Sequence, residues 1–126
     1  MSILSEAFEL APLGPNTWQG FADPRNEGGS GIFGGWTAAV LLKSVLDDGS
    51  HHGTPSAITV NYLRHVPARS TVVVRTRHLG DGGHSLNFWQ AEMFLEGQTE
   101  PAAIATIILA SRRKTDGFTD VAMPVV

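Results

Sequence analysis

Apolar residues crowd the stretch between residues 33 and 46, and they fall on nearly every side of the helix that this stretch predicts. The apolar set comprises Phe33, Trp36, Ala38, Ala39, Val40, Leu41, Leu42, Val45 and Leu46. A helix that is apolar all round is typical of a buried element rather than of a surface helix with one apolar stripe. We therefore predict a buried helix over 33–46 that needs cover on all sides.

After this helix the chain changes to strand patterns. Apolar residues alternate with polar ones over 58–63 and again over 71–79, which indicates half-buried strands. Glycine turns at 80–83 and 96–98 lead to two more predicted strands, which cover 85–95 and 102–113. Before the helix, the loop-rich segment 6–32 holds two short strand candidates, 8–10 and 17–21.

These elements predict an α+β fold, in which a curved antiparallel sheet wraps around one long central helix. The chain has 126 residues, which suits a single domain spanning 1–126. Such a sheet has an unpaired edge strand, and part of the helix is left uncovered. We therefore expect pairing with a second copy of the chain, as a homodimer or higher homo-oligomer.

Composition narrows the choice of partners. The formal net charge is −3, so no positive field is present to attract nucleic acid or an anionic membrane. Cysteine is absent, which excludes disulfides, thiolate metal sites and cysteine nucleophiles. No apolar run approaches the length of a membrane span, and the first residues lack a secretory signal pattern. We expect a cytoplasmic protein that binds neither nucleic acid nor membrane.

The stretch 26–36 is the most informative for chemistry. Gly34 and Gly35 stand where the helix should begin, although each glycine costs a helix about 0.5–1 kcal/mol relative to alanine. One interpretation is that the glycines let a ligand carbonyl approach the free N–H groups of the first turn, where the helix dipole favours negative charge. The other is that they let the helix pack closely against a strand.

Several segments, in order, resemble the hot-dog-fold acyl-CoA thioesterases of the thioesterase II type. Residues 33–39, Phe-Gly-Gly-Trp-Thr-Ala-Ala, look like the opening of that family's central helix. Residues 58–64 resemble its first long strand, which typically ends in an aromatic-Leu-Arg-Pro motif, and 73–86 resemble its next hairpin. The tail, about 114–126, is similar to the linker that follows the family's first unit.

This resemblance implies a hot-dog domain that acts on acyl-CoA, and it also raises a difficulty. The family carries two hot-dog units in one chain, and the acidic, hydroxyl and glutamine residues around the attacking water come from the second unit. Here the corresponding positions fall near Val40, Pro55, and Ile107 or Ile108, none of which can do this chemistry. The resemblance therefore leaves two possibilities open, an active enzyme with other catalytic groups and a non-catalytic half.

Other polar residues near the glycine pair are candidates for the missing chemistry. Glu27 is the candidate base for an attacking water and Asn26 the candidate residue to orient it, although both suit a solvated loop equally well. Asn61 is a further catalytic candidate, because a strand residue there could face a partner's helix start. Asn61 and His65 are also spaced like the acid and histidine of hot-dog hydratases, but the acid is missing.

The remaining candidate residues concern substrate contacts and metal binding. Phe33 and Trp36 flank the glycine pair and are expected to contact the acyl group, while Arg64 and Arg112 are candidates for the phosphates of CoA. Arginines alternating with valines, as at Arg75 and Arg77, also suit the solvated face of a sheet. The histidine pair at 51–52 and the histidine and serine at 84–85 lack acidic partners, so no metal site, cofactor or serine nucleophile is assigned.

The sequence thus predicts an acyl-CoA thioesterase that releases the free acid and CoA as a hot-dog dimer. The alternative is a non-catalytic module that binds acyl-CoA or forms half of a double hot-dog enzyme. A dehydratase on the same fold is the weakest possibility, because the paired histidine and acid are absent.

Overall fold

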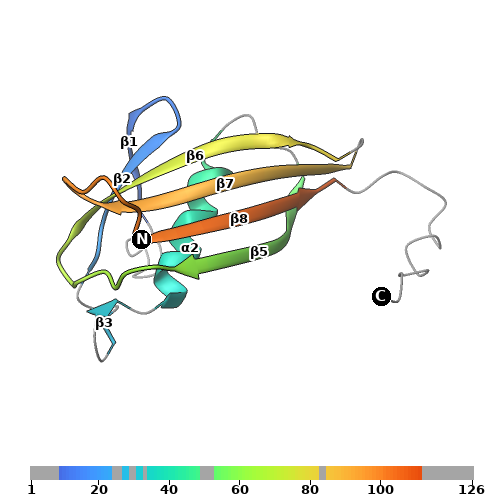
Figure 1. Cartoon of the computed structure of the whole chain (residues 1–126). Helices are drawn as coiled ribbons and strands as arrows, with labels where there is room; N and C mark the ends of the chain where they lie inside the picture. The colour runs from blue at the N-terminus through green and yellow to red at the C-terminus, as the bar shows by residue number, and fades with distance from the viewer. Residues whose placement is uncertain are drawn as a thin grey trace.

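The computed structural model describes residues 9–23, 27–28, 31–32, 34–48, 53–82 and 85–111. Six strands form one antiparallel sheet in the order β1-β2-β6-β7-β8-β5 (Figure 1). Their bounds are Ala11–Gly14 for β1, Thr17–Phe21 for β2, Thr54–Tyr62 for β5, Thr71–Asp81 for β6, Leu86–Leu95 for β7 and Ala103–Ala110 for β8. The small hairpin of β3 (Glu27–Gly28) and β4 (Gly31–Ile32) precedes the helix α2 (Gly34–Leu46).

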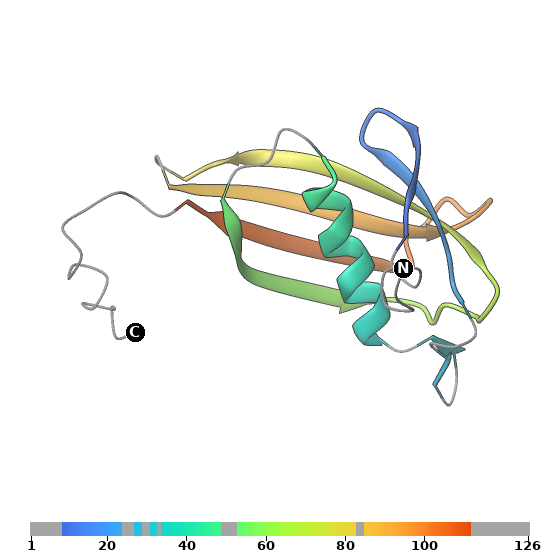
Figure 2. The same cartoon turned by 180° about the vertical axis from the view of Figure 1, so that it is seen from behind.

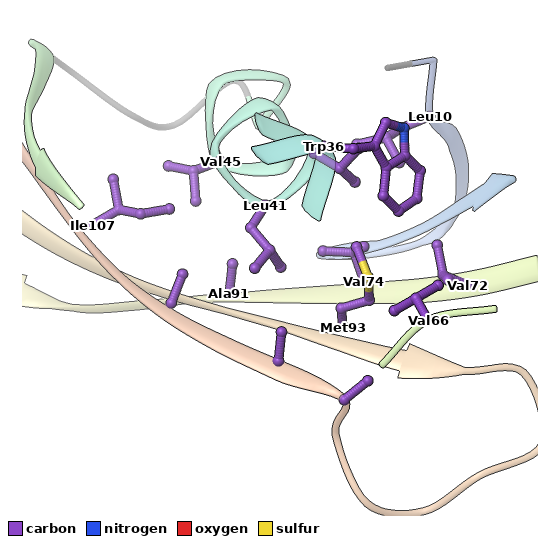
Figure 3. Packing of buried hydrophobic residues seen from close by; sticks show 14 of the residues in the cluster. Leu10, Trp36, Leu41, Val45, Val66, Val72, Val74, Ala91, Met93 and Ile107 are labelled. Atoms are coloured by element: carbon purple, nitrogen blue, oxygen red, sulfur yellow. The ribbon is translucent and has the colours of Figure 1, made fainter. Parts of the chain in front are cut away.

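Helix α2 lies across the concave face of the curved sheet (Figure 2). It packs mainly on the central strands β6, β7 and β8. In Figure 3 the side chain of Leu41 points from the helix toward the sheet, where Ala91 and Met93 lie, while Trp36 extends to Leu10. Alternate residues of β7 and β8 face the helix, and several of them are alanines, which lets the helix lie close to the sheet.

The helix has the predicted extent, but it is not covered on all sides. Its buried residues, among them Val40 and Leu41, occupy the face toward the sheet. Ala38, Ala39 and Leu42 on the other side are only half-buried, because the sheet covers one face of the helix and no described segment covers the other. Within the described residues this agrees with the expectation that the sheet leaves part of the helix uncovered.

The strands also agree with the sequence pattern, with shifts at their ends. The strand predicted at 58–63 is longer and starts at Thr54. Gly53 makes this start possible: its φ is +92°, and a Cβ there would come within 2.7 Å of the carbonyl group of Ala110. The first edge strand runs over 11–14 rather than 8–10, and residue 8 lies outside the described residues.

Strand β5 forms one edge of the sheet, with β8 as its neighbour. The N–H of Leu63 donates to the carbonyl of Ala102 at 2.8 Å, which fixes the alternation of hydrogen bonds along the strand. The N–H groups of Ile58, Val60 and Tyr62 therefore point away from β8. Along this edge Ile58, Tyr62 and Leu63 are exposed apolar residues. Among the described helices none has the length and apolar character needed to cross a bilayer.

Candidate active site

A cavity of about 360 Å³ opens at the N-terminal end of α2. Gly34 and Thr37 line it from the helix, and the consecutive residues 62–66 line it from the end of β5 and the loop that follows. Ala103 of β8 also lines it. The cavity thus joins the two segments in which the sequence pointed to chemistry, the glycine pair and the end of the first long strand.

The two glycines at the helix start differ in their surroundings. A Cβ on Gly34 would lie 3.2 Å from the ring and hydroxyl of Tyr62, whose Oη–H donates to the Gly34 carbonyl at 2.8 Å. A Cβ on Gly35 would meet nothing within 4 Å. Gly34 therefore serves the close packing of helix against strand, and packing gives no reason for a glycine at 35.

The helix start has the electrostatic character of an anion site. The first four N–H groups of a helix have no partner within the helix, and the dipole adds about half a positive charge there. No acidic residue lies in the first turn of α2 to offset this charge. A carbonyl oxygen that gains negative charge during attack would be stabilised at this position.

The loop after β5 is held firmly at the rim of the cavity. The backbone N–H groups of Leu63 and Arg64 both donate to the carbonyl of Ala102, at 2.8 and 3.0 Å. Val66 is 4% exposed and belongs to the core. The Arg64 guanidinium pairs with the Glu100 carboxylate, and both side chains are more than half exposed. Arg64, a predicted phosphate contact, therefore lies at the cavity with a carboxylate as its present partner.

Other predicted site residues lie elsewhere. Trp36 is 4% exposed and packs in the core, beside Leu10 in Figure 3. Asn61 is on the sheet face opposite the helix, because its neighbour Tyr62 reaches α2 and side chains alternate along a strand. The structure therefore does not bring Asn61 to the start of its own helix.

Several predicted site residues lie outside the described parts of the structure. Asn26, Phe33 and Arg112 lie outside the described residues, as do the tail 114–126 and the histidine candidates at 51–52 and 84. For Glu27 the structure gives only the backbone, which pairs with Ile32 in the β3–β4 hairpin. These residues remain predictions.

The arginines of β6 belong to a separate surface. Alternate residues of β6 are buried on the side of the helix, namely Val72, Val74 and Thr76. Because side chains alternate along a strand, Arg75 and Arg77 point to the opposite face of the sheet. The Arg75 guanidinium lies 5.1 Å from the centre of the Phe94 ring, and Arg77 donates to the Gln90 side-chain oxygen at 3.3 Å. This arrangement agrees with the interpretation of a solvated sheet face.

Sequence reasoning missed Thr37, Tyr62 and His65 as residues of this cavity. Tyr62 and His65 flank the Leu-Arg part of the motif noted above, and His65 stands where that motif carries proline. The histidine in place of proline was the feature of the sequence that could have indicated this site. No group of three or more histidine, aspartate or glutamate side chains that could hold a metal ion occurs within the described ranges.

Comparison with known proteins identifies the family. A family profile described as the acyl-CoA thioesterase N-terminal domain matches residues 21–110. The chain belongs to this family. Among curated proteins no significant match is found. The acyl-CoA thioesterase N-terminal domain profile runs from the last residue of β2 to the last residue of β8 and includes the whole of α2, so it covers both segments that line the cavity.

Solved structures confirm the hot-dog fold. A conserved hot-dog protein of unknown function from Alicyclobacillus acidocaldarius is 25% identical, with a TM-score of 0.81 over 100% of this chain and 46% of its own. A protein named as a putative thioesterase II from Thermobifida fusca gives 22% identity and a TM-score of 0.78, over 100% of this chain and 46% of its own. A mutant of the phenylacetic acid degradation protein PaaI from Thermus thermophilus is 15% identical, covering 88% of this chain and 100% of its own, with a TM-score of 0.72.

The chain therefore spans about half the length of the first two of these proteins. The structure also shows what occupies the positions at which the resemblance placed catalytic groups. Val40 and Ile107 are buried in the core between helix and sheet, and Pro55 is exposed on β5. None of these three side chains carries a group that can activate a water molecule.

Proposed function

We propose that this thioesterase-family domain hydrolyses acyl-CoA thioesters and that the reacting carbonyl binds at the start of α2. The observation that carries the proposal is the cavity of about 360 Å³ beside Gly34, together with the open space over Gly35. A thioester carbonyl oxygen in that space accepts hydrogen bonds from the first-turn N–H groups. Negative charge that develops on this oxygen is then stabilised by preorganised donors.

The reaction needs only water as co-substrate. The water oxygen attacks the carbonyl carbon, the carbon–sulfur bond breaks, and the products are a carboxylic acid and the thiol of CoA. Glu27 as base and Asn26 as the residue that orients the water remain the candidates from the sequence. The half-buried helix side formed by Ala38, Ala39 and Leu42 offers an apolar surface for the acyl chain.

The phosphate groups of CoA would bind to Arg64 at the rim of the cavity. Arg64 lies at the cavity, and its carboxylate partner Glu100 is an exposed side chain that a phosphate group can displace. Phe33 and Arg112 remain candidates for acyl and phosphate contacts respectively. An acyl-CoA substrate suits the cytoplasmic location predicted from the sequence.

We further propose that a second hot-dog unit completes the site by pairing with β5. Strand β5 has nine residues, exposed apolar side chains and no second neighbour among the described strands, and such an edge favours association. Pairing at this edge would add cover beside Tyr62, which touches the helix start. A second copy of the chain can supply this unit, and so can a different hot-dog unit.

A thiol-release assay with acyl-CoAs of several chain lengths tests the activity, and light scattering at the assay concentration tests the assembly. We expect thiol release and the mass of a dimer or larger oligomer. Ile58→Lys should lower the mass to that of a monomer, whereas Leu79→Lys, a matched change of an exposed apolar residue on β6, should not. A folded oligomer that releases no thiol from any chain length would refute the hydrolase proposal.

A second candidate function is a non-catalytic acyl-CoA-binding half of a larger assembly. It is favoured by the match to an N-terminal domain family and by coverage of only 46% of two similar chains. It predicts binding of acyl-CoA, measured by calorimetry, without turnover. Turnover by the purified chain alone would exclude it.

A further inference from the structure

Three side chains at the rim of the helix-start cavity carry groups that exchange protons or bear charge: Tyr62, Arg64 and His65. The Tyr62 hydroxyl donates to the Gly34 carbonyl, and the Arg64 guanidinium is paired with Glu100. His65 has no hydrogen bond or ion pair with any residue in the described ranges, and it is exposed to the cavity. His65 is therefore the one of these three side chains that no described residue engages.

Histidine is also the residue whose chemistry suits the reaction. Imidazole is the side chain that most readily takes up and releases a proton between pH 5 and 8. A guanidinium stays protonated and a tyrosine hydroxyl stays neutral in that range. A water molecule between an imidazole and a thioester carbonyl can therefore lose its proton as it attacks.

The backbone holds His65 between two fixed points. On one side, Leu63 and Arg64 donate to the same carbonyl of Ala102; on the other, Val66 is buried in the core. His65 therefore has little freedom in its backbone position, while its side chain stays at the cavity rim. A positioned base requires this combination of a fixed backbone and an imidazole that no described residue engages.

We propose that His65 is the general base of thioester hydrolysis in this chain, a proposal that rests on the proposed function. The imidazole accepts a proton from the water whose oxygen forms the new bond to the carbonyl carbon. The resulting oxyanion is held at the first-turn N–H groups of α2. When the carbon–sulfur bond breaks, the imidazolium returns the proton to the sulfur, so the enzyme is regenerated and the products are acid and thiol.

This assignment explains how the chain manages without the usual polar groups. The positions near Val40 and Ile107 are buried and apolar, and the cavity has no carboxylate among its lining residues in the described part of the chain. The histidine stands at the place where the resembling motif has proline. The base is thus supplied from the loop after β5 instead of from the helix or from β8.

Steady-state kinetics of His65→Gln test the proposal, with His78→Gln as the matched control. His78 is an exposed histidine on β6 that packs against Trp89, outside the cavity. We expect His65→Gln to lower kcat by about 10²–10⁴-fold with KM changed less than about threefold, since proton transfer contributes factors of this size. The fall in kcat toward acid pH, present in the wild type and in His78→Gln, should disappear in His65→Gln.

Added imidazole gives a readout that a structural role would not produce. His65→Ala should recover part of its lost kcat in imidazole buffer, and the recovery should grow with the neutral form of the buffer as pH rises. Circular dichroism and light scattering check that each variant keeps the fold and the assembly of the wild type. Should His65→Gln misfold, the smaller amide variant His65→Asn takes its place.

The outcomes separate this inference from the proposed function. If the wild type releases thiol and His65→Gln does so at a similar rate with the same pH profile, the assignment of His65 is refuted and the hydrolase proposal stands. The assignment would also be refuted if the fall in kcat toward acid pH disappeared in Glu27→Gln but not in His65→Gln. The base would then belong to the segment before the helix. If the wild type binds acyl-CoA without releasing thiol, both proposals fail.

Discussion

Replacement of Gly35 by alanine should make the protein more stable and less active. A Cβ at this position meets no atom within 4 Å, so the added methyl group costs nothing in the folded state. Alanine also restricts the unfolded chain, which stabilises by about 0.4–1 kcal/mol at a compatible position. For a domain of this size we expect a rise in Tm of about 2–6 °C.

The same methyl group should interfere with the reaction. In a helix each Cα–Cβ bond tilts toward the N-terminus, so the Cβ of residue 35 would project into the space over the first turn. An oxyanion has to come within about 2.7–3.1 Å of its N–H donors, and loss of one such donor typically costs about 10²–10³ in kcat. We expect kcat/KM to fall about 100-fold, which corresponds to about 2.7 kcal/mol of transition-state stabilisation.

Thermal unfolding and thiol release, measured on the same preparation, check both parts. Gly14→Ala is the matched control, because a Cβ at Gly14 also meets nothing within 4 Å and β1 lies at the opposite edge of the sheet from β5. That control should keep full activity. A Gly35→Ala protein that is more stable and fully active would refute the reasoning, since the glycine would then serve no ligand.

Three further substitutions test the fold through urea unfolding. Gly53→Ala should destabilise by about 2–4 kcal/mol, because φ is +92° and a Cβ would lie 2.7 Å from the Ala110 carbonyl; a loss below about 0.5 kcal/mol would contradict this. Leu41→Ala should cost about 2–5 kcal/mol, since Leu41 is fully buried between helix and sheet, and a surface-like effect would show that the core is not as described. Lys43→Met should change the free energy of unfolding by less than about 0.5 kcal/mol, because the exposed ion pair of Lys43 with Asp47 contributes little; a loss above about 1 kcal/mol would contradict that expectation.

The fold was accessible from the sequence because its elements carry strong local patterns. The helix over 33–46 was predicted from its dense apolar residues, and the strands from period-2 alternation around residues such as Val72 and Val74. The first edge strand was predicted at the wrong residues because β1, with sequence Ala-Pro-Leu-Gly, is exposed throughout and shows no alternation of apolar and polar positions. The apolar residues all round the helix indicated that the helix needs further cover, but they do not say which segment or partner supplies it.

The site was predicted less completely, for a physical reason. A cavity depends on which segments meet in space, and the meeting of Gly34 with Tyr62 joins residues 28 positions apart in the chain. The glycine pair was found because glycine at a helix start is locally costly. His65 was considered only with Asn61 as a hydratase pair and was set aside because the acid is missing. Its place at the cavity depends on the loop anchored on Ala102, which no spacing rule reveals.

If a second unit pairs with β5, as proposed, Tyr62 would connect that contact to the helix start. This residue belongs to the free edge strand, and its hydroxyl also holds the carbonyl of Gly34 at the start of α2. If a second unit that pairs with β5 changes the affinity of the helix start for a ligand by some factor, the ligand must change the strength of pairing by the same factor. Saturating acyl-CoA would then shift the monomer–oligomer equilibrium, and the apparent substrate affinity would depend on protein concentration.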